Sequence, residues 1–140
     1  IIIVTNQAGI AKGLYTENDF QKLTNDFDFF CLNNNVKILD TFYCPHHKDG
    51  TVKKYTKSCK NRKPNSGMFF KAAKLYNIEL TKAIMVGDNI TDITASINAG
   101  IRNNYLLKPD LTKEKLSNEL KFTIKENLLS VTREIFNQLY

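Results

Sequence analysis

The stretch AIMVGDNITDITASINAG, residues 83–100, contains the signals for a strand, a turn and a helix in that order. Residues 83–86 are apolar at every position, which is typical of a strand buried on both faces of a parallel sheet. An acidic turn containing Asp88 follows, and a helix is expected over about 92–99, with Gly100 as its C-terminal cap. This order is the repeating unit of an α/β fold, in which functional sites form at the carboxyl ends of strands.

The rest of the chain repeats this alternation, so we expect one α/β domain over residues 1–140, with a parallel sheet flanked by helices in a Rossmann-like arrangement. A long polar loop, residues 44–64, interrupts it, and a loop of this length in a compact domain suggests a function. The other strands are expected at 1–4, 40–44, 105–107 and 122–124, and the helices from Thr16 to the asparagines at 33–35, over 66–76 and, as a pair, within 109–140.

Two apolar stripes are predicted to be core. The helix that begins after Thr16 has a capping signal, since Asp19 follows three residues later, and its apolar residues recur at helical spacing. The C-terminal segment carries a second set of apolar residues. The residues expected to be buried are Phe20, Leu23, Phe27, Phe30 and Cys31 in the first set and Leu128, Leu129, Ile135 and Phe136 in the second.

The formal net charge of +6 is concentrated in the polar loop, where seven cations face a single acid, Asp49. Such a loop should attract anions, although for Lys53, Lys54 and Lys57 the pattern favours a plain solvated lysine-rich loop. A nucleic-acid partner is disfavoured, because we find no nucleic-acid-binding module and Tyr55 is the main aromatic residue among the cations. The cations are Lys48, Lys53, Lys54, Lys57, Lys60, Arg62 and Lys63.

The cysteine content and hydropathy exclude several classes of protein. Three cysteines, an odd number, argue against a disulfide framework. The sequence contains neither an apolar run long enough to cross a bilayer nor a secretion signal. We therefore expect a cytoplasmic protein with no membrane partner.

Polar residues gather at the end of the first predicted strand. Thr5, Asn6 and Gln7 offer a hydroxyl and two amides that can donate hydrogen bonds to phosphate oxygens. Such residues are also common in turns, where they bond their own backbone, and that alternative stays open.

A pair of acids follows the strand at 83–86. Asp88 lies just beyond the strand and Asp92 four residues later, and Mg²⁺ takes few protein oxygens and completes its shell with substrate and water. Asp92 alternatively caps its helix, where negative charge is favoured, but that leaves Asp88 unexplained.

A third cluster lies in the polar loop. Arg62 and Lys63 precede a proline and a helix, and together they suit a phosphate, Arg as a fork and Lys as a point charge. Cys44, His46 and Cys59 have the ligand types and spacing of a structural zinc site. The fourth ligand is expected at position 61, which is Asn61, a poor zinc ligand.

Four segments together resemble the haloacid dehalogenase (HAD) superfamily of phosphatases, in the branch that contains heptose 1,7-bisphosphate and histidinol-phosphate phosphatases. The segments occur in the family's order, and the cysteine-histidine loop is specific to this branch. They are VTNQAGIAKGLYTE, YCPHH, CKNRKPNSGM and VGDNITDITASINAG.

The resemblance implies roles for matching residues. Thr5 would hold the transferring phosphoryl group, and Lys63 would neutralise its charge. Asp88 would bind Mg²⁺, and Asp92 would orient that site without ligating the ion. The remaining implied roles are the shaping of the substrate loop by Asn6 and Gln7, recognition of substrate by Arg62, and zinc binding by Cys44, His46 and Cys59.

The chain departs from the family pattern in two ways. Asn61 replaces a zinc-ligating cysteine, so we expect tight zinc binding to be lost; the alternatives are weak binding by three residues or a site completed by water or by His47. The family's nucleophile belongs to an Asp-x-Asp motif at the end of a central strand, which lies between the strand ending at Thr5 and the strand ending at Asp88. No strand of this sequence ends in that motif.

The missing motif leads us to expect an N-terminally shortened phosphatase that is inactive by itself, with two strand edges facing a gap. The complete enzyme would hydrolyse a phosphosugar, most simply heptose 1,7-bisphosphate, through an aspartyl-phosphate with Mg²⁺ as cofactor. Histidinol phosphate or another small phosphate ester is an alternative substrate, a 3′-phosphorylated nucleic-acid end competes with them, and a silent phosphate-binding fragment is the alternative class. We expect a monomer.

Overall fold

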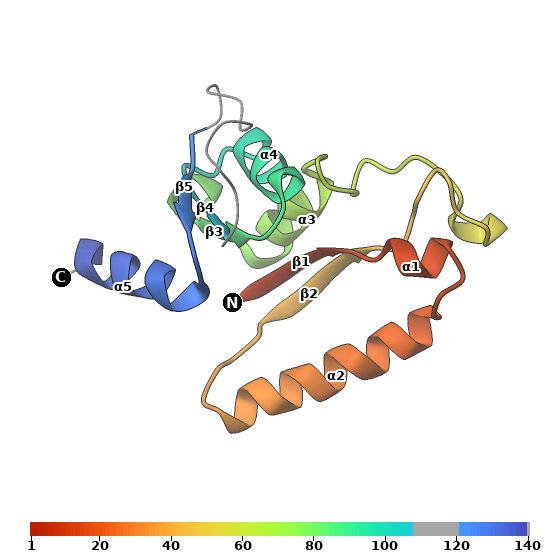
Figure 1. The fold of residues 1–140 in the computed structure, drawn as a ribbon, viewed down its shortest axis with the longest axis horizontal. Coiled ribbons are helices and arrows are strands. Elements are labelled where there is room, and N and C mark those ends of the chain that lie inside the picture. Colours follow the sequence, from red (N-terminus) through yellow and green to blue (C-terminus); the bar gives the residue numbers. More distant parts are fainter. Residues whose placement is uncertain (108–120, 140) are drawn as a thin grey trace.

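The computed structural model describes residues 1–107 and 121–139, and within them it has two parallel sheets (Figure 1). In the first sheet β1 (Ile2–Asn6) pairs with β2 (Asp40–Cys44). In the second sheet the order is β3-β4-β5, formed by Ile84–Gly87, Asn103–Leu107 and Thr123–Lys125. Every pairing is parallel, which confirms the predicted α/β class.

Helices connect the strands, and most begin within two residues of their predicted starts. In Figure 1, β1 and β2 lie between α2 and α3. The expected helix early in the segment 109–140 lies mostly outside the described residues. The helices are α1 (Ala8–Ala11), α2 (Glu17–Asn33), α3 (Gly67–Tyr76), α4 (Ile90–Asn98) and α5 (Leu128–Leu139), with 3-10 turns η1 (Lys53–Tyr55) and η2 (Leu80–Lys82).

The prediction for α2 was right about the helix and wrong about much of its burial. Thr16 and Asp19 form the reciprocal capping box that the sequence predicts. Of the predicted stripe, Phe20 and Cys31 are buried. The others are exposed, because periodicity shows which face of a helix is apolar but not whether another element covers it. The exposed fractions are 64% for Leu23, 45% for Phe27 and 63% for Phe30.

The main core lies between α3, α4 and the strands. Phe69 of α3 packs with Ala95, Ala99 and Ile101, and Val4 of β1 is among the partly buried residues around this cluster. Gly100 has φ +93°, so it supplies the left-handed residue after α4 that the sequence predicts. This cluster places the ends of β1 and β3 on the same side of α3.

The edges of β1 and β3 face each other across an apolar groove. Among the strands of the described chain, β1 pairs only with β2, and β3 only with β4. The groove has a volume of about 570 Å³ and is lined by apolar residues from both strands, including Ile2, Val4, Ile84 and Val86. This geometry agrees with the expectation that these two strand edges face a gap.

The C-terminal prediction was wrong for three residues. Leu128, Leu129 and Phe136 are exposed, and Val131 is the fully buried residue of α5 instead. The fourth predicted residue, Ile135, is partly buried, and periodicity does not specify how much of an apolar face another element covers. No helix within the described ranges is long and apolar enough to cross a bilayer.

Candidate active site

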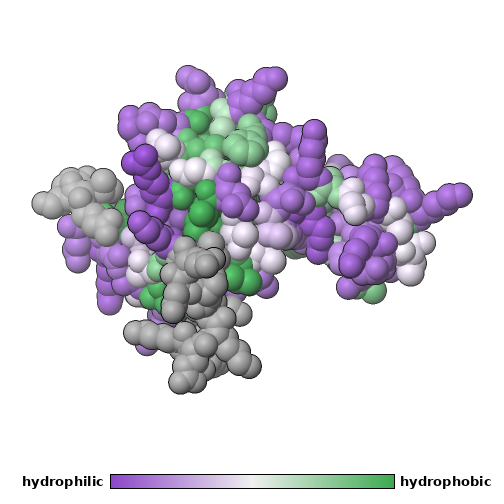
Figure 2. Space-filling view, turned by 90° about the horizontal axis from the view of Figure 1, so that it is seen from above, coloured by the Kyte–Doolittle hydropathy of each residue, from purple (hydrophilic) through white to green (hydrophobic). Residues whose placement is uncertain are grey.

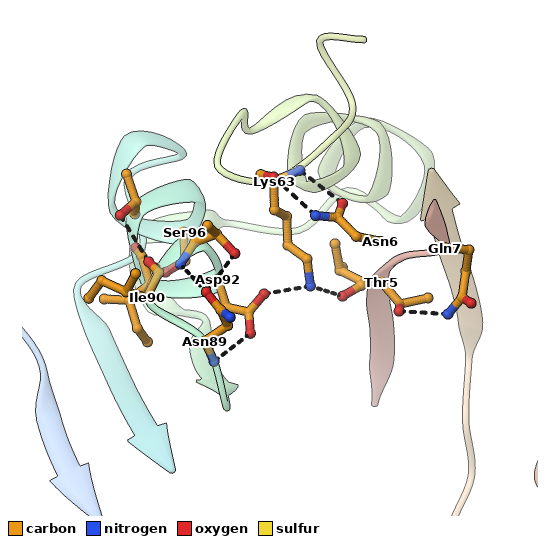
Figure 3. Close-up of polar contacts among 12 residues, drawn as sticks. Thr5, Asn6, Gln7, Lys63, Asn89, Ile90, Asp92 and Ser96 are labelled. Atoms are coloured by element: carbon orange, nitrogen blue, oxygen red, sulfur yellow. Dashed lines mark hydrogen bonds and ion pairs between the residues drawn. The ribbon is translucent and has the colours of Figure 1, made fainter. Parts of the chain in front are cut away.

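A polar hollow of about 380 Å³ lies at the carboxyl ends of β1 and β3. Figure 3 shows the side chains that converge there from three separate segments of the chain. The structure thus brings together members of all three polar clusters noted in the sequence. The lining residues are Thr5, Asn6, Arg62, Lys63, Asp88, Asn89, Thr91 and Asp92.

Lys63 is the buried cation of this hollow. Its ammonium lies 2.7 Å from Asp92 Oδ1 and donates a hydrogen bond of 2.6 Å to the carbonyl of Val4. The side chains of Lys63 and Asp92 are only 8% and 7% exposed. A buried charge is tolerated when it is paired and hydrogen-bonded, so the ion pair and the carbonyl together fix the ammonium in place.

Asn6 positions Lys63. Its side-chain amide donates to the Lys63 carbonyl and accepts from the Lys63 N–H, both at 3.0 Å (Figure 3). These two bonds join the end of β1 to the loop before α3 and occupy one donor and one acceptor of the Asn6 amide. The amide therefore holds the loop, and its remaining hydrogen is the donor left for a phosphate oxygen.

Gln7 and Tyr15 orient Thr5. Gln7 Nε2 donates to Thr5 Oγ1 at 2.9 Å, and the Tyr15 hydroxyl donates to Gln7 Oε1 at 2.5 Å. Because Thr5 Oγ1 accepts this bond, its own hydrogen is available for a phosphate oxygen. The sequence interpretation missed Tyr15. The structure shows that its ring lies against Gly9, where a Cβ would collide with it.

Asp92 both caps α4 and pairs with Lys63. Asn89 and Asp92 form a capping box in which the Asn89 N–H donates to Asp92 Oδ2 at 3.1 Å. Its other oxygen, Oδ1, binds Lys63. Gly87 makes room for this carboxylate, because a Cβ at that position would lie 2.5 Å from the Asp92 Cβ. Because both of its carboxylate oxygens are engaged, Asp92 is suited to orient Lys63 without ligating a metal ion itself.

Asp88 is the open carboxylate of the hollow. It is exposed and makes no hydrogen bond or ion pair with any other described residue. A hard divalent cation prefers such an oxygen ligand and takes its remaining ligands from phosphate and water. The residues present therefore fit Mg²⁺, with Asp88 as the ligand.

Cys44, His46 and Cys59 form a compact metal-ligating group. Their ligand atoms all lie within 4.8 Å of one another, although Cys44 ends β2 and Cys59 precedes Arg62 in the loop. Burial raises the pKa of the Cys44 thiol to about 11, and burial together with Lys57 lowers the pKa of His46. The neutral His46 ring can ligate a metal directly, whereas Cys44 has to release a proton first.

Asn61 is the place where this group departs from a closed zinc site. Asn61 Oδ1 is buried and has no hydrogen-bond partner in the described chain. It lies against Gly67 at the start of α3, where a Cβ would come within 2.5 Å of this oxygen. The three ligands fit a zinc ion, but the fourth position lacks the thiolate that closes a structural site.

The loop 44–64 is tied to α2 through Glu17, a contact that the sequence interpretation missed. The hydroxyls of Tyr55 and Tyr43 both donate to the Glu17 carboxylate, the second at 3.0 Å, and Lys54 lies 3.7 Å from it. The Tyr55 hydrogen bond is the main cause that lowers the pKa of Glu17. The start of α2 is thereby joined to Tyr43 of β2 and to η1 in the middle of the loop.

Comparison with known proteins gives consistent matches. Residues 60–122 match a family model described as HAD-hydrolase-like. A D-glycero-alpha-D-manno-heptose-1,7-bisphosphate 7-phosphatase of Photorhabdus laumondii is 41% identical over 96% of this chain and 73% of its own length. The D-glycero-beta-D-manno-heptose-1,7-bisphosphate 7-phosphatase of Haemophilus influenzae is 40% identical over 77% of this chain.

A solved structure agrees with the fold. The crystal structure of D,D-heptose 1.7-bisphosphate phosphatase from B. bronchiseptica, complexed with magnesium and phosphate, superposes with a TM-score of 0.82 at 24% identity. The match covers 98% of this chain and 74% of the B. bronchiseptica chain. The chain spans only 58% of the length of the Haemophilus relative.

The α/β fold and the matches to the HAD-hydrolase-like model and to the 41% identical relative define the class of the chain as a hydrolase of the HAD type. Within that class, the chain belongs to the family of the heptose-1,7-bisphosphate 7-phosphatases.

Proposed function

We propose that this chain carries the phosphate-binding and metal-binding part of a magnesium-dependent phosphatase that acts on a phosphorylated sugar, heptose 1,7-bisphosphate in the first instance. The observation that carries the proposal is the buried ion pair of Lys63 and Asp92 between the open Asp88 carboxylate and the Thr5 hydroxyl. The 41% identical relative with that activity supports the same assignment.

Each of the residues around the polar hollow has its own role in the binding or hydrolysis of a phosphate ester. The Thr5 hydroxyl donates to one phosphate oxygen, and the fixed Lys63 ammonium offsets negative charge that develops during transfer. Asn6 and Asp92 hold that ammonium in place, and Arg62 contacts the rest of the substrate from the loop. Mg²⁺, held by Asp88, would supply further charge stabilisation at the phosphoryl oxygens.

We propose that the loop 44–64 forms the substrate-facing rim of this single domain. Its anchoring by Glu17 at one end and by Asn6 at the other keeps Arg62 and Lys63 at the hollow.

Three free cysteines suit a reducing compartment, which supports a cytoplasmic location.

The experiment that tests this function compares substrates at equal concentration with Mg²⁺ and with EDTA. The 140-residue chain is assayed beside a longer chain in which a strand ending in Asp-x-Asp precedes Ile1. We expect phosphate release from heptose 1,7-bisphosphate by the longer chain to exceed release from histidinol phosphate and from a 3′-phosphorylated oligonucleotide, and to stop in EDTA. Equal release with EDTA, or preference for either competitor, contradicts the assignment.

A silent phosphate-binding role is the second candidate. The polar hollow contains two carboxylates among the described residues, Asp88 and Asp92, and Lys63 engages the second. Neither is placed as the family's nucleophile. Binding of the bisphosphate by both chains in calorimetry, with no phosphate released by either, favours this candidate.

We further propose that Cys44, His46 and Cys59 bind zinc with three ligands and therefore weakly. Asn61→Cys should then tighten zinc binding by about 100-fold, because it adds the fourth ligand of a site type whose complete form binds zinc with about 10–16 kcal/mol. Competition with a chromogenic chelator measures the affinity. Lys60→Cys is the control, since it adds a thiol one residue away on an exposed side chain. Equal zinc affinity of Asn61→Cys and the unaltered protein would refute the three-ligand site.

A further inference from the structure

A second hollow, of about 200 Å³, adjoins the polar hollow of the candidate active site. The two hollows share Arg62 and Lys63 as walls. Lys48 and Lys57 line the second hollow but not the polar hollow. A ligand can therefore extend from the Thr5 and Lys63 end into this second space.

The second hollow is strongly positive. It is lined by four cations and by no carboxylate, and one of the four, Lys63, is already paired with Asp92. In the described part of the chain Lys48 and Lys57 form no ion pair, and the Arg62 guanidinium donates a hydrogen bond of 3.3 Å to the His46 carbonyl. The neighbouring acid Asp49 lies 3.9 Å from His47 Nδ1, outside the lining. Unpaired cations in a concave surface attract an anion.

Backbone hydrogen bonds bring the two lysines together. The Tyr55 carbonyl accepts from the His47 N–H at 3.2 Å and from the Lys57 N–H at 3.1 Å, which joins the residue before Lys48 to the turn that carries Lys57. On the opposite wall, Asn65 donates to Cys59 and Arg62 carbonyls at 3.2 and 2.8 Å. The hollow is therefore formed by a bonded loop before any ligand arrives, which reduces the entropy cost of binding.

We propose that this hollow binds the second, unreacted phosphate of a bisphosphorylated small substrate, and that Lys48 and Lys57 determine the preference for two phosphates over one. The inference rests on the proposed function and adds residues to its specificity. A volume of 200 Å³ accommodates a phosphate with its first waters, given about 30 Å³ per water molecule.

A small bisphosphate fits better than a nucleic acid. Single-stranded nucleic acids bind grooves in which several aromatic rings stack on bases, whereas this hollow is lined by no Phe, Tyr or Trp and by one imidazole, that of His47. The nearby Tyr55 hydroxyl is committed to Glu17, and its ring lies beneath the Lys54 ammonium. In Figure 2 the lobe at the right, where Figure 1 places η1, is largely hydrophilic.

The test compares hexose 1,6-bisphosphate and hexose 6-phosphate binding to the 140-residue chain by calorimetry with Mg²⁺. Lys48→Gln/Lys57→Gln should weaken bisphosphate binding about tenfold and change monophosphate binding less than about twofold. Lys37→Gln/Lys53→Gln is the matched control. It removes the same charge from exposed lysines outside the hollow and should leave both affinities unchanged.

Each other outcome has a defined meaning. If both double variants weaken the bisphosphate equally, net charge explains the effect and the subsite is refuted, while the proposed function stands. If the unaltered chain binds neither sugar phosphate, both the proposed function and the subsite fail. If a 3′-phosphorylated oligonucleotide binds more tightly than the bisphosphate and loses affinity in Lys48→Gln/Lys57→Gln, a nucleic-acid groove replaces the subsite.

Discussion

Lys63→Met is expected to lower the free energy of unfolding by about 3–5 kcal/mol, because it leaves the Asp92 carboxylate buried without its partner. The methionine preserves most of the side-chain volume, so the lost charge rather than a cavity causes the change. A loss of this size is a large fraction of the 5–15 kcal/mol typical of a domain. Urea denaturation followed by circular dichroism measures it.

A second substitution makes this prediction sharper. Asp92→Asn removes the charge and keeps an oxygen that can accept from the Asn89 N–H, so the cap of α4 survives. Lys63→Met combined with Asp92→Asn should therefore be more stable than Lys63→Met alone. If the double variant is less stable than either single variant, the buried pair does not explain the role of Lys63.

Asp88→Asn is expected to reduce magnesium-dependent phosphate release by about 100- to 1000-fold while leaving the fold intact. The carboxylate is the open oxygen ligand of the polar hollow, and loss of one stabilising group at a reacting phosphate costs about this much. Since Asp88 is exposed and unpaired in the described chain, its replacement should change stability by less than about 0.5 kcal/mol. The rate is measured on the longer chain with the Asp-x-Asp segment.

Asp49→Asn is the matched control for this experiment. It removes an acid whose side chain is 70% exposed and which lies outside both hollows. It should keep the full rate at every Mg²⁺ concentration. If Asp88→Asn also keeps the full rate, Asp88 does not bind the metal, and the proposed site is wrong.

The elements that the sequence predicted well are those with local signals. The capping box at Thr16 and Asp19 starts α2, and Gly100 ends α4, so both helices are located within two residues. The polar residues at strand ends were also predictable, because parallel strands of an α/β fold end at a common edge. Local chemistry was enough for these features.

The features that the sequence did not predict depend on distant parts of the chain. Asn6 and Lys63 are 57 residues apart, and their two hydrogen bonds follow from how the loop crosses β1. Leu23 and Phe30 belong to a periodic stripe yet remain exposed, because burial needs a second surface that periodicity does not specify. Asn61 was recognised as the departure, but its unpartnered oxygen against Gly67 required the structure.

Lys63 makes the catalytic geometry depend on the alignment of two sheets that share no hydrogen bond. Its ammonium contacts Val4 in the sheet of β1 and Asp92 beside the sheet of β3, across the apolar groove. The ammonium is therefore correctly placed only when the sheet of β1 and the sheet of β3 lie at the right distance from each other. A substitution deep in the groove should thus disturb the proposed phosphate site while every residue that lines the polar hollow remains unchanged, and such a loss would come from the misplacement of the two sheets.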